Sequence, residues 1–336
     1  MSPGRLRTAR AGPPAADLLR LLAGGPLPLP GGAAAPVTAV EERFPAARST
    51  HRVHRLRLTL AGGRRLDAVF KRLRHQPGKD AGREVHVYRR LLADGALGAP
   101  RLYASLHDEA AGRYWLLLED VGRRGLDRCR GRAAEAAVRW AARMHALHQG
   151  REERLRGLGC LGEHGPEFCG LLVRAARRRI AGAAPHGLLD RFDRLAAGLP
   201  RTVRALGRQP RTLVHGDLAG HNLLVQHGGS RVRPVDWEWA AIGPGAWDLG
   251  RLLAGTGPAA VRNRLLTAYR EEFARHTPDA PEPGALRAAL AHCAVLRGLW
   301  QLGCPSPLPR GVRLEPAALG RHLDALARMQ RAAGGG

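Results

Sequence analysis

The chain is poor in several residue types, and each shortage excludes some classes of function. It has five cysteines in 336 residues, none in C-x-x-C spacing, so neither a zinc site nor a redox dithiol is indicated. Aromatic residues make up only 4%, and no nucleic-acid-recognition motif occurs, which argues against nucleic acid as a partner. The sequence contains no run of about 18 apolar residues, so no membrane span is predicted. Asp17 and Arg20 interrupt the apolar stretch near the N-terminus, so no secretion signal is indicated and we expect a cytoplasmic protein.

Lysine is almost absent, although the chain is strongly basic. Lys and Arg total 54 against 29 for Asp and Glu, a formal net charge of +25, yet only two residues are lysine, and one of these is Lys71. The arginines follow amphipathic helical stretches, which indicates solvated faces in an arginine-favouring composition. A lysine kept in such a composition indicates a position where a planar guanidinium cannot replace a compact ammonium. Lys71 is therefore a candidate functional residue.

The most informative pattern is the segment HGDLAGHN at 215–222, followed fourteen residues after Asn222 by Asp236 in Asp-Trp-Glu. Asp217 lies in a turn that its glycine neighbours allow to fold tightly. Any one of these polar residues, taken singly, is typical of an ordinary turn. Together, two carboxylates and a carboxamide at this spacing are typical of enzymes that hold a hydroxyl nucleophile beside a magnesium-bound nucleotide.

The residues between the two motifs predict a β-hairpin. Residues 222–226 and 231–236 are typical of two strands, and 227–230 of the turn that joins them. Asn222 and Asp236 are then expected to meet at the open end of the hairpin. Their side chains offer the oxygen ligands that Mg²⁺ prefers.

These motifs resemble the signature of the aminoglycoside phosphotransferase and choline kinase group: His-Gly-Asp, four residues, Asn, a hairpin, then Asp-Trp-Glu. The resemblance implies a bilobal α+β fold of the protein-kinase type, with a small mixed β-sheet lobe, a larger helical lobe and ATP or GTP with Mg between them. It implies that Asp217 is the catalytic base and that Asn222 and Asp236 bind magnesium. It also implies that Asp248 accepts hydrogen bonds from backbone amides near His215. A helix N-cap is the plain alternative for Asp248.

The same resemblance requires a strand lysine and a helical glutamate upstream. Lys71 lies in 66–73, which alternates apolar and polar residues like a half-buried strand. Glu84 opens a helical pattern over 84–92 and is expected to hold Lys71 towards the phosphates. The alternative is that Glu84 only complements the helix dipole. Segment 113–122 resembles the hinge that binds the adenine edge through its backbone, with Glu119 and Val121 as contributors.

One departure concerns the loop that covers the phosphates, which is usually rich in glycine. Residues 45–52, between the predicted strands 37–44 and 53–60, contain no glycine. A hydroxyl donor, Ser49 or the neighbouring Thr50, is expected to make this contact instead.

The order of these patterns predicts three regions. Residues 1–36 are a partly disordered N-terminal extension with one short helical stretch, 37–121 are the N-lobe, and 122–336 are the C-lobe, which includes the catalytic loop and the metal-binding hairpin. Helical periodicity in the C-lobe predicts helices at 132–148, 167–181, 188–206, 247–254, 258–276, 284–302 and 316–333.

The sequence thus indicates an ATP-dependent, Mg-dependent phosphotransferase acting on a hydroxyl group of a small molecule such as an antibiotic, a sugar or another natural product. Because the whole-protein field is positive and acidic residues are few, we expect an acceptor that is not strongly cationic. Two alternatives stay open at this point. One is a kinase of Ser or Thr hydroxyls in a peptide or protein, and the other is an inactive nucleotide-binding scaffold. The sequence does not indicate an oligomeric state.

Overall fold

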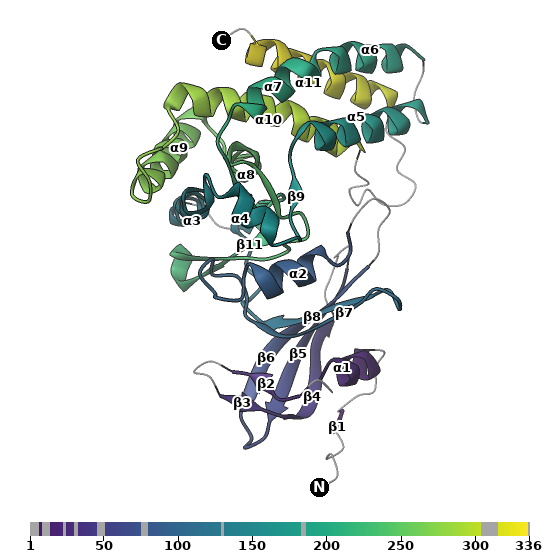
Figure 1. Ribbon diagram of the computed structural model, residues 1–336, viewed down its shortest axis with the longest axis vertical. Helices are drawn as coiled ribbons and strands as arrows, with labels where there is room; N and C mark the ends of the chain where they lie inside the picture. The colour runs from purple at the N-terminus through teal and green to yellow at the C-terminus, as the bar shows by residue number, and fades with distance from the viewer. Residues whose placement is uncertain are drawn as a thin grey trace. The chain divides into compact units, whose positions relative to one another are not determined.

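The computed structural model describes residues 7–8, 14–22, 25–29, 33–45, 51–74, 80–128, 131–182, 186–303 and 315–334. The chain folds as two compact units, one formed by Met1–Cys129 with His221–Trp239 and the other by Arg130–Gly220 with Ala240–Gly336. The first unit is mainly β-sheet and the second mainly helical (Figure 1), which confirms the predicted α+β class. The predicted lobe boundaries differ from these units, because the prediction placed the hairpin after Asn222 in the C-lobe, whereas it belongs to the first unit.

The first unit is built on a six-stranded sheet with the strand order β1-β4-β5-β6-β8-β7. All neighbouring strands pair antiparallel except β1 and β4, which pair in parallel. The predicted strands at 37–44, 53–60 and 66–73 are confirmed within a residue or two. The strand bounds are β1 Arg7–Thr8, β4 Val37–Pro45, β5 Arg52–Leu60, β6 Arg65–Leu73, β7 Leu102–Asp108 and β8 Arg113–Glu119.

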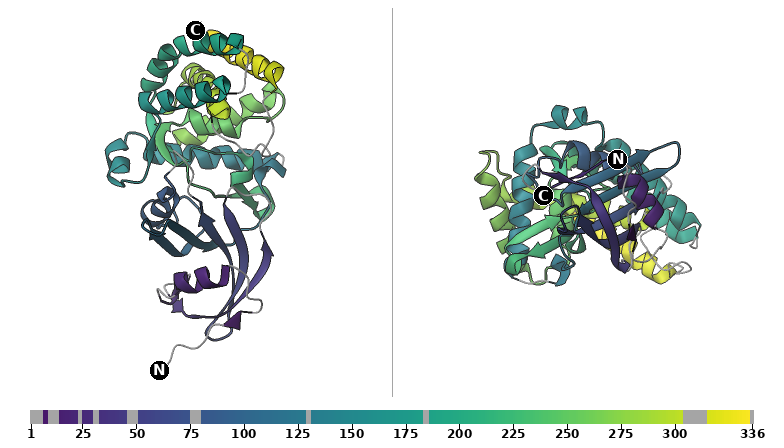
Figure 2. Two further views of the ribbon diagram at one scale, coloured as in Figure 1. Left: turned by 90° about the vertical axis from the view of Figure 1, so that its right-hand side faces the viewer. Right: turned by 90° about the horizontal axis from the view of Figure 1, so that it is seen from below.

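Two helices belong to this unit. Helix α1, Pro14–Leu22, inserts Leu18 and Leu21 into the same apolar cluster as Phe70 of β6, so this part of the predicted extension packs against the sheet (Figure 2). The two-residue strands β2, Leu27–Pro28, and β3, Ala34–Ala35, pair with each other. Helix α2, Arg83–Arg90, contacts β7 and β8. Its position after β6 is what brings Glu84 to the strand that carries Lys71.

The predicted hairpin is present in the first unit. Strands β11, Leu223–Gln226, and β12, Arg231–Pro234, pair antiparallel with Leu223 opposite Pro234. The turn between them is a short 3₁₀ segment, His227–Gly229. The hairpin therefore opens at Asn222, one of the two predicted magnesium ligands, and at Val235, which precedes the other, Asp236.

The second unit is a helical assembly around α10, which packs against α5, α7, α8 and α11, while α3 packs against α9. The predicted helix at 188–206 is wrong as a single element. It is two helices, because Pro200 lies in the first turn of the second and Gly198 precedes it. The bounds are α3 Arg132–His148, α4 Glu152–Gly157, α5 Pro166–Ala181, α6 His186–Ala197, α7 Leu199–Gly207, α8 Ala246–Leu252, α9 Ala259–Ala274, α10 Pro283–Gly303 and α11 Pro316–Gly334.

A three-stranded sheet of order β10-β13-β9 completes the second unit. Its strands are β10 Arg211–Val214, β13 Ala241–Pro244 and β9 Gly162–Glu163. The loop that begins with His215 follows β10 directly, and α8 follows β13, so pairing of these two strands brings the loop and the helix together. No helix in the described ranges is long and apolar enough to cross a membrane.

Candidate active site

Lys71 is the centre of a buried charge cluster in the first unit. Its Nζ donates to Glu84 Oε2 at 2.6 Å and to Asp236 Oδ1 at 2.6 Å. The predicted contact between Lys71 and Glu84 is confirmed. Glu84 also lies in the first turn of α2, so its contact with Lys71 and its favourable place in the helix dipole hold together. Lys71 is 7% exposed and Glu84 is 1% exposed, which makes this a desolvated ion pair.

The cluster shifts the pKa values of both partners. Burial alone lowers the pKa of Lys71, but the carboxylates of Asp236, Glu84 and Glu238 outweigh burial, and the net pKa is above its ordinary value. Burial raises the pKa of Glu84, and the positive charge of Lys71 opposes that rise. Lys71 is therefore charged at any physiological pH and is held by acids from two separate chain segments.

The hairpin places the two predicted metal ligands at its open end. The carbonyl oxygen of Asn222 accepts a hydrogen bond from Val235 N–H at 2.9 Å, so Asn222 lies opposite the residue before Asp236. Asp236 has a φ of 68°, in the left-handed region that Asp and Asn tolerate better than other non-glycine residues. This turn of the backbone lets the Asp236 carboxylate reach Lys71.

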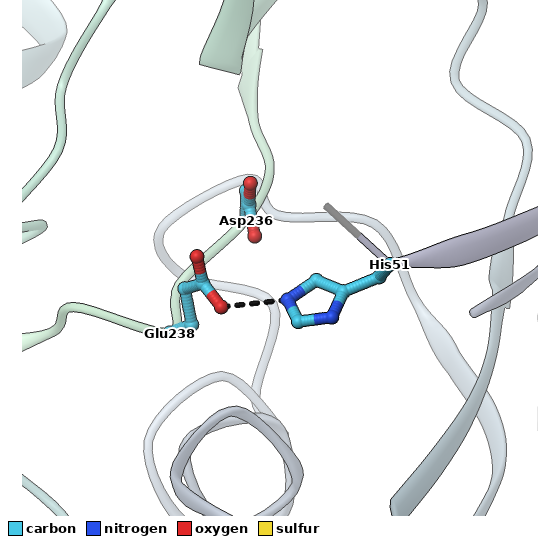
Figure 3. A group of neighbouring side chains, drawn as sticks. All are labelled: His51, Asp236 and Glu238. Carbon is cyan, nitrogen blue, oxygen red and sulfur yellow. Dashed lines mark hydrogen bonds and ion pairs between the residues drawn. The ribbon is translucent and has the colours of Figure 1, made fainter. Parts of the chain in front are cut away.

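A second acid and a histidine lie beside Asp236. One ligand atom each from His51, Asp236 and Glu238 lie within 4.8 Å of one another, and His51 Nε2 is 2.7 Å from Glu238 Oε2 (Figure 3). Sequence reasoning assigned His51 no role and counted Glu238 only among the few acids. Glu238 could have been found from its place in Asp-Trp-Glu, whereas His51 carries no sequence signal. The oxygen donors of Asn222, Asp236 and Glu238 fit Mg²⁺, which binds carboxylates and carbonyl oxygens.

The predicted hinge residues have well-defined partners within the first unit. The Glu119 carboxylate accepts from Arg233 Nη2 at 2.6 Å, and the Glu119 N–H donates to the Arg101 carbonyl at 2.9 Å. The Val121 carbonyl accepts from Gln226 Nε2 at 3.0 Å. The Glu119 side chain thus ties β8 to the hairpin strand β12.

Ser49 and Thr50, the residues expected to contact the phosphates, lie outside the described residues.

In the second unit, the loop after β10 is braced by Asp248. The Asp248 carboxylate accepts from His215 N–H at 2.6 Å and from Gly216 N–H at 3.0 Å, which confirms the predicted contact. Burial raises the pKa of Asp248, but hydrogen bonds from His145 and His215 outweigh burial and hold the pKa below its ordinary value. His145 also contacts the Tyr269 hydroxyl at 2.8 Å, so this helix-borne histidine supports the brace. The loop is therefore fixed by a buried, ionised carboxylate.

Asp217, the candidate base, has an arginine partner that sequence reasoning missed. Arg251 Nε donates to Asp217 Oδ1 at 3.0 Å from helix α8. A further cation, Arg297 of α10, donates to the Trp247 carbonyl, and its guanidinium carbon lies 5.2 Å from the centre of the Trp247 ring. Burial, with the nearby charge of Arg251, lowers the pKa of Arg297 to about 10. The candidate base is thus bonded by one arginine, and its charge also acts on a second one.

The comparisons with known proteins agree with this arrangement. A family model described as "Phosphotransferase enzyme family" matches residues 42–288. No curated protein matches the sequence.

Solved structures share the fold. An ethanolamine kinase of Plasmodium vivax is 14% identical, with a TM-score of 0.62 over 88% of this chain and 84% of that one. A choline kinase of Cryptosporidium parvum is 13% identical, with a TM-score of 0.59 over 87% and 89%. A protein named APH(2")-IIia, solved as a GDP and kanamycin complex, is 13% identical, with a TM-score of 0.58 over 94% and 99%. At these identities the likeness shows the protein-kinase-like fold, as predicted.

Proposed function

Because the chain belongs to the phosphotransferase enzyme family, whose members transfer a phosphoryl group to a hydroxyl, we propose that it uses ATP and Mg²⁺ and acts on a small molecule. The observation that carries this proposal is the double contact of Lys71. It bonds Glu84 and Asp236 at 2.6 Å each, so one ammonium is held between a helical acid and an acid of the hairpin. A lysine paired with a helical glutamate is part of the arrangement that protein kinases use to position phosphates, and this supports the proposal.

Each residue then has a defined task in the first unit. Lys71 contacts the phosphates, and Glu84 keeps its ammonium in place. Asn222 and Asp236 hold the magnesium ion, which when bound neutralises negative charge on the phosphate oxygens. The Glu119 amide already donates to the Arg101 carbonyl, and the Val121 carbonyl already accepts from the Gln226 side chain. A hinge contact with the nucleotide base would therefore use the Glu119 carbonyl and the Val121 amide. Such backbone contacts suit ATP, and the GDP complex of a structural relative makes GTP the alternative donor.

In the second unit, Asp217 orients the acceptor hydroxyl and accepts its proton. The hydrogen bonds from His215 and Gly216 to Asp248 fix the backbone on which Asp217 is carried. Because the transition state of phosphoryl transfer is loose, orientation and charge neutralisation carry most of the rate. A rigid loop therefore matters more than a strongly basic carboxylate.

The acceptor is, in this proposal, a hydroxylated compound that is not strongly cationic. The names of the structural relatives include ethanolamine, choline and kanamycin, all of which carry positive charge. In this chain Arg251 bonds Asp217, and Arg297 lies close enough for Asp217 to influence its pKa. A cationic acceptor would meet these two arginines, whereas a neutral hydroxyl compound would not be repelled.

The two alternatives differ in what they require. A peptide or protein kinase would need an extended acceptor surface, and no contact in the described residues supports one over a small molecule. An inactive scaffold would need the chemical groups to be incomplete or misplaced. The contacts of Lys71 with its two acids and of Asp248 with its loop argue against that reading.

The test is an ATP-consumption screen with hydroxylated antibiotics, sugars and peptides, run with magnesium and repeated with Asp217→Asn. We expect wild-type protein to consume ATP with neutral small molecules, and Asp217→Asn to lose about 1000-fold or more of the rate while binding nucleotide normally. Unchanged turnover in Asp217→Asn would refute its role as base. Consumption only with peptides or only with polycations would refute the proposed acceptor class but leave the phosphotransferase assignment intact.

A further inference from the structure

Arg297 of helix α10 is a buried cation of the second unit with an unused hydrogen-bond donor. The residue is 7% exposed. Its Nη2 donates to the Trp247 carbonyl, and its guanidinium carbon lies 5.2 Å from the centre of the Trp247 ring. Its other terminal nitrogen, Nη1, is enclosed and has no hydrogen-bond partner in the described part of the chain. A buried charged donor without a partner is costly, so this nitrogen indicates a binding position rather than a packing contact.

Trp247 connects Arg297 to the loop that carries Asp217. The indole Nε1–H of Trp247 donates to the Gly216 carbonyl at 2.7 Å, while the Trp247 backbone carbonyl accepts from Arg297. Gly216 is next to Asp217 in the chain, and the charge of Asp217 acts on Arg297. The packing of α10 against α8 therefore brings a buried guanidinium within electrostatic range of the candidate base.

The electrostatic setting of Arg297 is unfavourable for a cation. Burial, followed by the charge of Arg251, lowers the pKa of Arg297 to about 10. Cys293, Asp248 and Asp217 act in the opposite direction but do not offset burial. The guanidinium nevertheless stays charged at neutral pH. Two arginines thus act on each other here, and the one that bonds Asp217 is Arg251, at 3.0 Å.

The chemistry of a guanidinium selects the partner that would suit this position. Its planar N–H groups match the oxygens of a carboxylate, and a charge-assisted hydrogen bond is stronger than a neutral one. An anionic oxygen group would bond Nη1 of Arg297 and would also reduce the repulsion between Arg297 and Arg251. A neutral hydroxyl would supply only the hydrogen bond. A cationic group would supply neither.

We propose that the acceptor is a hydroxy acid, and that Arg297 recognises its carboxylate while Asp217 orients the hydroxyl that is phosphorylated. The inference rests on the proposed function and narrows its acceptor class. In the transfer, the acceptor oxygen bonds the γ-phosphorus, the bond from that phosphorus to the bridging oxygen breaks and releases ADP, and the hydroxyl proton passes to Asp217. The carboxylate of the acceptor takes part in none of these bond changes and serves only as an anchor.

A purely structural role is the alternative for Arg297. Such a role would use its contact with Trp247 to support the loop at Gly216. It accounts for Nη2 but not for Nη1. The two roles also differ in their consequences. Loss of structural support would slow transfer to every acceptor alike, whereas loss of recognition would slow transfer only to acceptors that carry the anionic group.

Three variants separate these roles. Arg297→Gln removes the charge and keeps an N–H donor, and Arg297→Lys keeps the charge without the planar guanidinium. Arg287→Gln is a matched control, because Arg287 is an exposed arginine of the same helix, about 15 Å away along the helix axis. All three are made in the full-length chain, and their melting temperatures are measured first.

The measurement is kcat/KM for ATP consumption with matched acid and amide acceptors: glycerate, gluconate and glucuronate, each beside its amide. We expect wild-type protein to prefer the acid over the amide by about 10- to 100-fold, as a charged hydrogen bond requires. Arg297→Gln should lose this preference by slowing the acid while the amide stays within about threefold of wild type. Arg297→Lys should keep a smaller preference, and Arg287→Gln should keep the whole of it.

The outcomes that overturn the proposal are distinct. Equal loss for acid and amide in Arg297→Gln would show a structural role. A preference that survives in Arg297→Gln would assign the carboxylate to another residue. If Arg297→Gln does not fold, the absence of an acid preference in wild type, or an undiminished one in Arg297→Lys, overturns the role of this guanidinium. ATP consumption with neutral compounds but with no acid overturns this inference and leaves the proposed function intact, whereas no consumption with any acceptor defeats both.

Discussion

Asp236 contributes to the protein in two ways that substitution can separate. Its backbone is in the left-handed region, with φ at 68°, and its carboxylate accepts a hydrogen bond from Lys71 at 2.6 Å. Asn tolerates the left-handed backbone but carries no charge, whereas Ala carries no charge and is also strained in the left-handed region. We therefore expect Asp236→Asn to remove the function of the carboxylate without straining the backbone. Asp236→Ala should remove that function and also strain the backbone.

The magnitudes follow from the contacts. Loss of the charged hydrogen bond to Lys71 costs about 1.5–3 kcal/mol. Removing the carboxylate also relieves its repulsion with Glu238, which at a separation of 4.8 Å is about 3.5 kcal/mol for an effective dielectric constant of about 20. These effects offset each other, so Asp236→Asn should change the free energy of unfolding by less than about 2 kcal/mol. Asp236→Ala should be less stable than Asp236→Asn by a further 1 kcal/mol or so.

Scanning calorimetry and nucleotide titration test the two contributions. Asp236→Ala should melt about 2–4 °C below Asp236→Asn. Both should lose about 100-fold or more of the Mg²⁺-dependent affinity for AMP-PNP. Asp67→Asn is a matched control, because Asp67 is an acid of the same unit that pairs with Arg57 at a partly exposed site and should change neither quantity. Normal Mg²⁺ affinity in Asp236→Asn would refute the metal role, and equal melting of the two variants would refute the backbone argument.

Two further predictions concern Lys71 and Asp248. Lys71→Arg keeps the charge, but a planar guanidinium cannot reproduce two 2.6 Å contacts at a site that is only 7% exposed. We therefore expect this variant to fold but to lose about 100-fold in kcat/KM. Activity near wild type in a steady-state assay would show that the positive charge alone suffices. Asp248→Asn should lower the melting temperature at neutral pH by about 6–12 °C, for a cost of about 3 kcal/mol. Because the pKa of Asp248 is depressed in the fold, its stabilisation is present above pH 3.8 and is lost as the pH falls below that value. The gap in melting temperature between wild type and Asp248→Asn should therefore begin to narrow as the pH falls below about 4, and a constant gap across the acid range would contradict this account.

Contacts that depend on local periodicity were predictable from the sequence. The alternating strand around Lys71 and the helical pattern beginning at Glu84 are adjacent in the chain, so a strand followed by a helix brings the two residues together. The hairpin after Asn222 was predictable because turn residues separate two short runs with the pattern of strands. The brace from Asp248 to the backbone near His215 came from resemblance to a family, since the two residues are far apart in sequence.

Contacts between single residues distant in sequence were not predictable. His51 and Glu238 are separated by 187 positions, and neither belongs to a repeating pattern that would indicate the other. Arg251 is one of many arginines, so nothing in the composition distinguishes the one that bonds Asp217. Strand β10 has only four residues, Arg211–Val214, too few for a periodic signal. In each case the information lies in packing across the fold.

The residues that contact Lys71 are acids, whereas the residue that bonds Asp217 is an arginine, and this difference separates the tasks proposed for the two residues. Lys71 contacts Glu84 and Asp236, and the charge of Glu238 also raises its pKa, so in the proposed function these acids attract the metal ion despite the positive field of the chain. Arg251 bonds Asp217, and the charge of Asp217 acts on Arg297, so in the proposed function this part of the second unit favours an acceptor without positive charge. Variants of the first group should therefore weaken Mg²⁺-dependent nucleotide binding, whereas variants of the second should change transfer and acceptor choice with nucleotide binding intact. A variant of Arg251 that weakened Mg²⁺-dependent binding as much as one of Asp236 would contradict this division.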